Sequence, residues 1–138
     1  MLPRTSSAVL LAILATGASA AAHHSFAVFF DDTKSIAVRG TVTEFRFTNP
    51  HGVITFTGSP VAGGKPETWR AETNAPTILR RRGWTPTSLK AGDVITVEGW
   101  PSRDGKSYMR MRRVIRADGK ELGAPAAAPN TDPSGERK

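Results

Sequence analysis

The chain has 138 residues, of which 38% are hydrophobic and 22% are charged, and its formal net charge is +7. This length leaves room for one folded domain, and the composition excludes collagen-like, coiled-coil and multi-span membrane proteins. The chain contains no cysteine, which excludes disulfides, thiolate metal sites, iron–sulfur clusters and a cysteine nucleophile.

Residues 1–22 have the three parts of an export signal. Arg4 supplies the positive charge, residues 8–15 form an apolar stretch, and small residues follow. The apolar stretch is too short to span a membrane, which takes about 20 apolar residues. Cleavage after Ala20 and cleavage after Ala22 both fit the pattern. We therefore expect a periplasmic or secreted protein with no transmembrane segment in the mature chain.

The end of the chain has a different composition from its middle. Residues 123–138 are rich in proline, alanine and glycine and have no apolar periodicity. This composition predicts a disordered tail. One folded domain is therefore expected over residues 23–122, between the export signal and the tail.

The folded part contains five stretches with patterns typical of β-strands. We expect strands over residues 35–48, 53–57, 67–72, 94–100 and 107–116. In the first strand the apolar positions change parity between Val42 and Phe45, which predicts a β-bulge, and Gly40 permits a sharp bend. Residues 58–64 are expected to form a loop.

A short helix is expected over residues 75–82. Asn74 is placed to cap this helix, Pro76 is tolerated in its first turn, and Gly83 is a stop signal after three arginines. Five strands with a helix between the third and fourth have the element order of the OB-fold, a five-stranded Greek-key barrel. We predict an all-β fold, a small five-stranded OB-like barrel; a small β-sandwich is the alternative.

Several short motifs resemble those of one protein family. In chain order they occupy residues 22–26, 40–43, 48–51, 79–85, 89–94 and 104–106. Together they resemble the small exported bacterial proteins catalogued as domain of unknown function 6152, over about residues 22–122. The HHSF and NPH pieces are the most specific. The resemblance implies export and is compatible with an OB-like barrel, but it brings no established activity. It marks the histidines as motif positions without giving them roles.

The chain has three histidines, His23, His24 and His51, and all lie in these motifs. If cleavage leaves His23 first, its amine and imidazole can chelate a metal ion to which His51 adds a nitrogen. If Ala21 comes first, Ala21-Ala22-His23 is the amino-terminal copper and nickel pattern. Nitrogen ligands of this kind favour Cu(II), then Ni(II) and Zn(II). We predict a divalent metal site, with copper first; the alternative is a solvated terminus and a turn histidine.

The N-terminal segment also carries acidic and aromatic residues. Asp31 and Asp32 are candidate oxygen ligands, although nothing in the spacing requires this. These acids more simply end the segment, and we expect Phe26, Phe29 and Phe30 to pack onto the barrel.

Basic residues are dense on the last strand. Arg110 and Arg112 alternate with methionines, which predicts a half-buried strand with a basic outer face that Arg113 extends. These arginines are candidate anion-binding residues for an acidic protein or an anionic cell-envelope component. An OB surface for single-stranded nucleic acid would add stacking aromatics, here Phe56, Trp69 and Tyr108. Export removes the protein from most nucleic acid, so we do not expect this partner.

Catalytic motifs are sparse in the sequence. It contains no Gly-x-Ser-x-Gly elbow, no glycine-rich phosphate loop and no local motif of a hydrolytic triad. We therefore expect an exported binding protein rather than a hydrolase. The competing enzyme class is a redox enzyme that uses the bound metal, which turnover of peroxide or a reductant would reveal.

Overall fold

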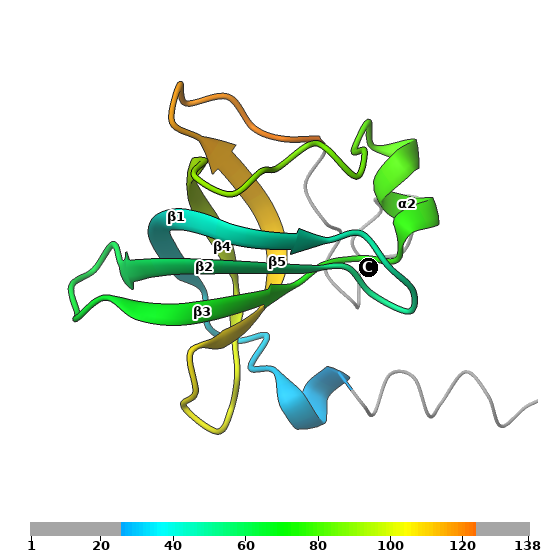
Figure 1. Ribbon diagram of the computed structural model, residues 1–138. Coiled ribbons are helices and arrows are strands. Elements are labelled where there is room, and N and C mark those ends of the chain that lie inside the picture. The colour runs from blue at the N-terminus through cyan, green and yellow to red at the C-terminus, as the bar shows by residue number, and fades with distance from the viewer. Residues whose placement is uncertain (1–25, 124–138) are drawn as a thin grey trace, which may run out of the picture.

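The computed structural model describes residues 26–123, which form a barrel of five strands with a short helix (Figure 1). In chain order the elements are β1 (Ile36–Arg46), β2 (Val53–Pro60), β3 (Glu67–Glu72), α2 (Pro76–Arg81), β4 (Val94–Pro101) and β5 (Tyr108–Arg116). The barrel is closed in the order β1-β2-β3-β5-β4. Paired strands are antiparallel except β3 and β5, which are parallel. The predicted all-β barrel with one helix between the third and fourth strands is confirmed.

Strand β1 serves two neighbours because it bends. It pairs with β2 along most of its length and with β4 over its first half. The register with β2 shifts between Val42 and Glu44, so the predicted bulge is confirmed. At the bend Gly40 lies opposite Gly58, and a side chain on either glycine would meet the backbone of the other strand. The two glycines therefore allow a close approach of the backbones.

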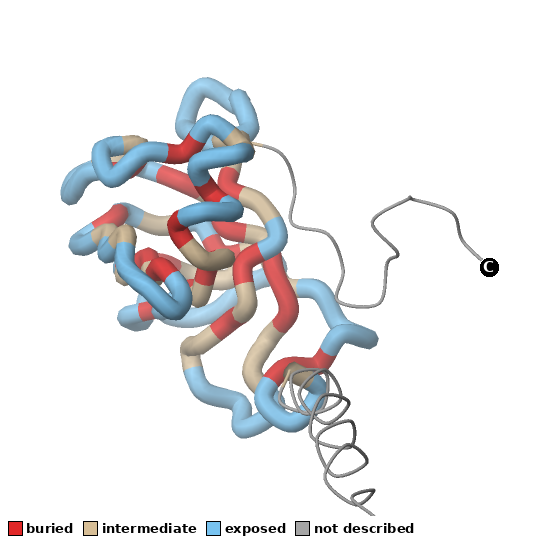
Figure 2. Tube along the Cα trace, turned by 90° about the vertical axis from the view of Figure 1, so that its right-hand side faces the viewer, coloured by how far each residue is buried: buried red, intermediate tan, exposed pale blue. Residues whose placement is uncertain are grey.

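Buried residues alternate with more exposed ones along the strands (Figure 2), and the buried ones form one hydrophobic core. Its largest fully buried side chains are those of Trp84, Phe56, Ile54 and Leu79. Leu79 belongs to α2 and Trp84 to the connection that follows it, so both segments are anchored in the same core as the strands. Burial of these large apolar side chains is the main stabilising term for the domain.

Strand β2 is longer than predicted. Residues 58–60 were expected to begin a loop, but the strand continues to Pro60. Gly58 remains in register with Gly40, and the pairing with β1 extends to Val38 opposite Pro60. A glycine that signals a loop in isolation is here required by the close approach of the neighbouring strand.

The predicted cap of the helix is wrong. Helix α2 begins at Pro76 after Ala75, and no side chain caps its N-terminus by a hydrogen bond. The amide oxygen of Asn74 instead accepts a hydrogen bond from Arg110 Nη2 at 2.6 Å. A distant partner on β5 thus replaces the local capping interaction.

The N-terminal segment packs against the barrel through two of its three phenylalanines. Residues 26–29 form a helical turn, and Phe30 then forms an isolated bridge to the residue after β4. The rings of Phe26 and Trp100 meet edge to face at 5.4 Å, and Phe30 is 4% exposed. Phe29 is 61% exposed, so the prediction that all three rings pack on the barrel is wrong for this one.

The described chain ends beside the core, where Leu122 packs against it. The predicted export signal, residues 1–22, lies outside the described residues, as does the predicted tail apart from Gly123. Within the described range, no helix is long and apolar enough to cross a membrane.

Candidate functional site

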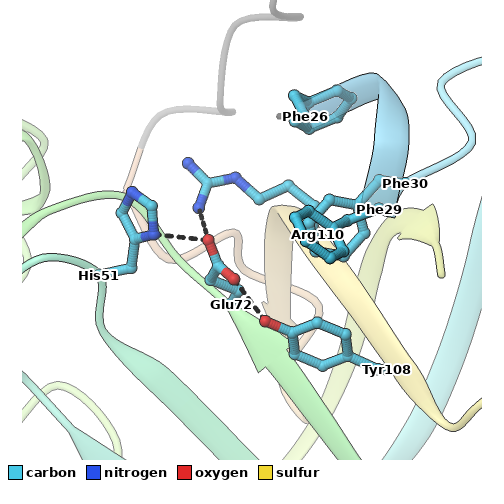
Figure 3. Close-up of a pocket in the computed structure, with 7 residues that line it drawn as sticks. All are labelled: Phe26, Phe29, Phe30, His51, Glu72, Tyr108 and Arg110. Carbon is cyan, nitrogen blue, oxygen red and sulfur yellow. Dashed lines mark hydrogen bonds and ion pairs between the residues drawn. The ribbon is translucent and has the colours of Figure 1, made fainter. Parts of the chain in front are cut away.

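A pocket of about 600 Å³ opens between the N-terminal helical turn and the barrel (Figure 3). Its walls come from that turn, the β1–β2 loop, the end of β3 and the start of β5. They are formed by Phe26, Phe29, Phe30, His51, Glu72, Tyr108 and Arg110. Phenyl rings form one side and polar groups the other, and the volume is typical of small-molecule sites.

Glu72 is at the centre of the polar side. Its Oε1 atom lies 2.5 Å from His51 Nδ1 and 3.1 Å from Arg110 Nη1. Its Oε2 atom accepts a hydrogen bond from the Tyr108 hydroxyl. The side chain is 19% exposed, and three donors, one of them a guanidinium, hold the carboxylate in one orientation.

The pairing of β3 with β5 brings Glu72 to its partners. These strands are parallel, with Glu72 opposite Arg110 and Arg70 opposite Tyr108. Residues two apart on a strand point to the same face, so Tyr108 and Arg110 both face the pocket. Met109, between them, points the other way and is fully buried in the barrel.

The β1–β2 loop places His51 at the pocket. Gly52, the next residue, extends the ladder between β2 and β3: its N–H donates to Asn74 O at 3.3 Å, and its carbonyl accepts from Thr73 N–H at 2.9 Å. A Cβ atom on Gly52 would meet the Thr73 side chain. The absence of a side chain therefore allows this loop to lie against the end of β3.

Arg110 ties the end of β3 to the start of β5. Besides Glu72, its guanidinium donates to Thr73 O at 2.5 Å and to Asn74 Oδ1 at 2.6 Å. The side chain is 14% exposed. Burial lowers the pKa of Arg110; the negative charge of Glu72 opposes this effect, and the positive charge of Arg82 adds to it.

Tyr108 is held as a neutral hydrogen-bond donor. Burial raises the pKa of its hydroxyl well above the usual range, and the hydrogen bond to Glu72 raises it further. The guanidinium carbon of Arg70 lies 5.9 Å from the centre of the ring, and its charge acts in the opposite direction. At neutral pH the hydroxyl keeps its proton and donates a hydrogen bond to the Glu72 carboxylate.

The contact with Glu72 also orients the His51 imidazole. Because Nδ1 faces the carboxylate, the neutral ring carries its proton on Nδ1 and has a lone pair on Nε2. The side chain is 46% exposed, and Nε2 points away from Glu72 (Figure 3). A nitrogen in this state can bind a metal ion or accept a proton.

The aromatic side of the pocket is continuous with the polar side. The ring centres of Phe26 and Phe30 are 5.4 Å apart, and those of Phe30 and Tyr108 are 5.3 Å apart. Phe29 also lines the pocket but is 61% exposed. Among the described residues, Phe29 is therefore a largely uncovered phenyl ring beside a group of polar side chains.

His51 is the one predicted metal-ligating histidine that the structure describes, and it lies in the pocket. His23 and His24 lie outside the described residues; His24 is two residues before Phe26, which lines the same pocket. Within the described part of the chain, no group of three or more histidine, cysteine, aspartate or glutamate residues could hold a metal ion. A metal site at His51 would therefore take its other ligands from outside the described range, where His23 and His24 lie.

The two acids considered as oxygen ligands do not line the pocket. Asp31 accepts a hydrogen bond from the Thr33 hydroxyl at 2.6 Å and pairs with Lys34 at 3.1 Å. These hydrogen bonds, that of Thr33 first, lower the pKa of Asp31 to about 2. Asp32 is exposed. The structure therefore does not bring either acid to His51.

The three predicted anion-binding arginines have different surroundings. Arg110 is bonded to the end of β3, as described above. Arg113 forms two hydrogen bonds to the Glu98 carboxylate, at 2.6 and 3.1 Å. Arg112 is exposed and lies over the Trp100 ring at 5.2 Å. Of the three, Arg112 is the one without a carboxylate partner among residues 26–123.

The aromatic residues considered for base stacking do not form a surface. Phe56 is fully buried and Trp69 is 6% exposed, and both belong to the core. Tyr108 lies in the pocket with its hydroxyl on Glu72. Stacking of successive bases on these three rings is therefore excluded.

Glu72 was not singled out from the sequence, and Tyr108 was considered only as an aromatic residue. Their hydrogen bond joins residues 36 positions apart in the chain, so no local motif contains both. The contact between Glu72 and Tyr108 could have been found only from the predicted topology, because in this barrel the end of the third strand lies beside the start of the fifth.

Comparison with known proteins agrees with the resemblance in the motifs. The sequence model of a family described as "Family of unknown function (DUF6152)" matches residues 11–110. This range includes all three histidines and every residue that lines the pocket, from Phe26 to Arg110. No curated protein is similar enough to give a match.

Proposed function

The chain belongs to this family of unknown function, and from its pocket we propose an exported small protein that binds a divalent transition metal, copper first. In this proposal His51 Nε2 is one ligand, and nitrogen atoms of His23 and His24 supply others. The observation that carries the proposal is the contact of His51 Nδ1 with the Glu72 carboxylate at 2.5 Å.

A carboxylate behind the imidazole is typical of metal-binding histidines. Such a partner fixes the ring orientation and makes the other ring nitrogen a better ligand. Glu72 is itself held by Arg110 and Tyr108, so the imidazole rests on a fixed carboxylate. The negative charge of Glu72 also offsets the positive charge of Arg110, and this reduces the repulsion of a metal cation at His51.

The N-terminal histidines are near the pocket in sequence. Phe26 lines it, and the two residues from His24 to Phe26 span at most about 7 Å of extended chain. If export leaves His23 first, its amine and imidazole join the ligands. If Ala21 comes first, the three-residue amino-terminal pattern supplies them. Both routes agree with a predominantly nitrogen site, for which Cu(II) has the highest affinity.

The test is a Cu(II) titration, by calorimetry and electron paramagnetic resonance, of protein recovered from the periplasm. Intact-mass analysis first checks export and identifies the first residue. We expect His51→Ala to change the spectrum and to weaken binding at least about tenfold, and Glu72→Gln to weaken it about 10- to 100-fold. Binding should also weaken as the pH falls, because protons compete with the metal for the imidazole nitrogen.

Two controls accompany this titration. Asp104→Asn makes the same change from carboxylate to amide as Glu72→Gln, but in an exposed turn that does not line the pocket, and should leave binding unchanged. An extra N-terminal Met tests the contribution of the first residue. Unchanged affinity and spectrum in His51→Ala would contradict the role of His51, and affinity no higher than that of free histidine would contradict the whole proposal.

Binding of an anionic polymer or an acidic protein has less support. Arg110 is only 14% exposed and lies within the pocket, and Arg113 pairs with Glu98. Of the predicted set, Arg112 alone is an exposed arginine without a carboxylate partner among the described residues. A redox enzyme would use the same metal site, and turnover of peroxide by the copper-loaded protein would identify it.

A further inference from the structure

The aromatic side of the pocket has no role in the proposed metal site. We propose that the pocket also binds a small organic acid with one or two aromatic rings. Its carboxylate faces Arg110, and its rings lie against the phenylalanines of the N-terminal turn. This goes beyond the metal site and does not depend on it.

The apolar part of the proposal rests on Phe29. This ring lines a pocket of about 600 Å³ and is 61% exposed, whereas Phe30 beside it is 4% exposed. A ligand ring placed on Phe29 would remove apolar surface of both partners from water and add a stacked or edge-to-face contact. The pocket is large enough for a bicyclic ligand and has apolar surface to cover it.

The charges around the polar side favour an anion. Glu72 is the one acidic side chain among the described residues that line the pocket, and its carboxylate already pairs with Arg110 and contacts the Tyr108 hydroxyl and His51 Nδ1. Arg110 lines the pocket, Arg70 lies over the Tyr108 ring, and the charge of Arg82 acts on Arg110. Around Arg110, positive charges therefore outnumber the one carboxylate that lines the pocket.

Arg110 has donors left for a carboxylate ligand. A guanidinium has five N–H groups, and three of those on Arg110 bond to Glu72, Thr73 and Asn74. The Nε–H and the second Nη2–H have no partner among the described residues. Figure 3 shows the guanidinium between His51 and the phenyl rings, so a carboxylate at Arg110 could form charge-assisted bonds while its rings reach Phe29.

Two other ligand classes fit only half of the pocket. A neutral aromatic compound would cover the phenyl rings but give the free Arg110 donors no charged partner. An inorganic anion or a short aliphatic acid would meet Arg110 but leave Phe29 in water. An aromatic monocarboxylate satisfies both sides.

The first experiment compares probes on the full, copper-free exported protein by calorimetry. The acids are 2-naphthoate and benzoate, and the comparison ligands are 2-naphthamide, benzamide and acetate. We expect 2-naphthoate to bind most tightly, and each aromatic acid to bind about tenfold or more tightly than its amide and than acetate, because the amide loses the charged hydrogen bond.

The second experiment uses a matched pair of variants. Phe29→Ala removes an exposed ring of the pocket and should weaken 2-naphthoate binding about three- to tenfold. Val28→Ala changes the preceding residue, which is 65% exposed and does not line the pocket, and should have no effect. Both side chains are exposed, so neither change disturbs the core. This pair avoids Arg110 variants, which would also break the bonds between β3 and β5.

Equal binding of acid and amide would overturn the inference, as would equal effects of Phe29→Ala and Val28→Ala. Copper titrations of the same two variants separate this inference from the metal proposal, because neither variant should change Cu(II) affinity. Copper binding without 2-naphthoate binding overturns the aromatic-acid site alone. Binding of 2-naphthoate without copper binding overturns the metal site alone.

Discussion

At the scale of single residues, Tyr108 is a direct probe of the pocket because it is the one tyrosine in the chain. Burial and the hydrogen bond to Glu72 raise the pKa of its hydroxyl well above the usual range. We expect the folded protein to show little tyrosinate at a pH somewhat above 10, where the unfolded chain, with a pKa of about 10, is largely ionised. An ultraviolet titration with and without denaturant measures both states.

The same shift has a consequence for stability. The folded state holds the Tyr108 proton more tightly than the unfolded state, so the free energy of unfolding falls as the pH rises above about 10 towards the folded pKa. Glu72→Gln should lower the Tyr108 pKa, whereas Glu67→Gln, which changes an acceptor of Ser107, should not. Ionisation of the folded protein near pH 10 would contradict the placement of the hydroxyl on Glu72.

His51 could be named from the sequence as a candidate ligand and Glu72 could not, for a physical reason. A histidine is rare in this chain and lies in a recognisable turn motif, so its own identity carries the signal. Glu72 acquires its role from Tyr108 and Arg110, which are 36 and 38 positions away. Strand pairing decides which distant donors reach a carboxylate, and the pairing cannot be read from the residue type of Glu72 alone.

At the scale of the elements, the close approach of β1 and β2 at Gly40 and Gly58 leaves no room for a side chain. A Cβ atom on Gly40 would meet the Thr57 carbonyl and the Gly58 Cα, and neither backbone atom can rotate away. Gly40→Ala should therefore lower the free energy of unfolding by about 2 kcal/mol or more, because the strands must separate locally. Urea unfolding followed by circular dichroism measures this change.

The control for this variant is Thr57→Ala in the same pair of strands. Thr57 is exposed, so its replacement introduces no clash and should cost less than about 1 kcal/mol in strand preference. Similar losses in Gly40→Ala and Thr57→Ala would show that the two strands adjust to a side chain at the crossing without strain.

The elements were predictable where local pattern and tertiary structure agree. The parity change after Val42 predicted the bulge, and the third strand has the predicted bounds of residues 67–72. The predictions were wrong at Gly58 and Asn74. In both places a neighbouring strand sets the conformation, through the Gly40 backbone in one case and Arg110 in the other.

At the scale of the whole molecule, the pocket exists because the N-terminal segment packs against the barrel. The barrel topology followed from the order of strands and helix. The pocket did not, since it combines residues 26–30 with the β1–β2 loop and the adjoining ends of β3 and β5. Asp31 lies at the junction: its N–H donates to Pro101 O at 3.0 Å. Its carboxylate binds Thr33 and Lys34 and lies 3.9 Å from Arg103 Nη1, whose side chain also donates to Ala27 O in the N-terminal turn.

This junction should make the attachment of the N-terminal segment sensitive to acid. The hydroxyl of Thr33 first, and then Lys34, lower the pKa of Asp31 from 3.8 to about 2. The folded state therefore binds the proton less tightly than the unfolded state. The stabilisation by Asp31 is complete above about pH 4 and is lost as the pH falls through about 2.

Asp31→Asn removes the charge but keeps an oxygen that can accept from Thr33, so the variant should lose part of the wild-type stability at pH 5 and show a shallower decline between pH 4 and 2. Urea midpoints from tryptophan fluorescence at several pH values measure this difference. Asp32→Asn is the matched control, because Asp32 is exposed and makes no side-chain hydrogen bond within the described residues.

At pH 5 a parallel measurement with 2-naphthoate should show weaker binding in Asp31→Asn than in Asp32→Asn, since the first change loosens the segment that carries Phe29. Identical pH profiles for the two variants would show that the charge of Asp31 does not hold the segment on the barrel.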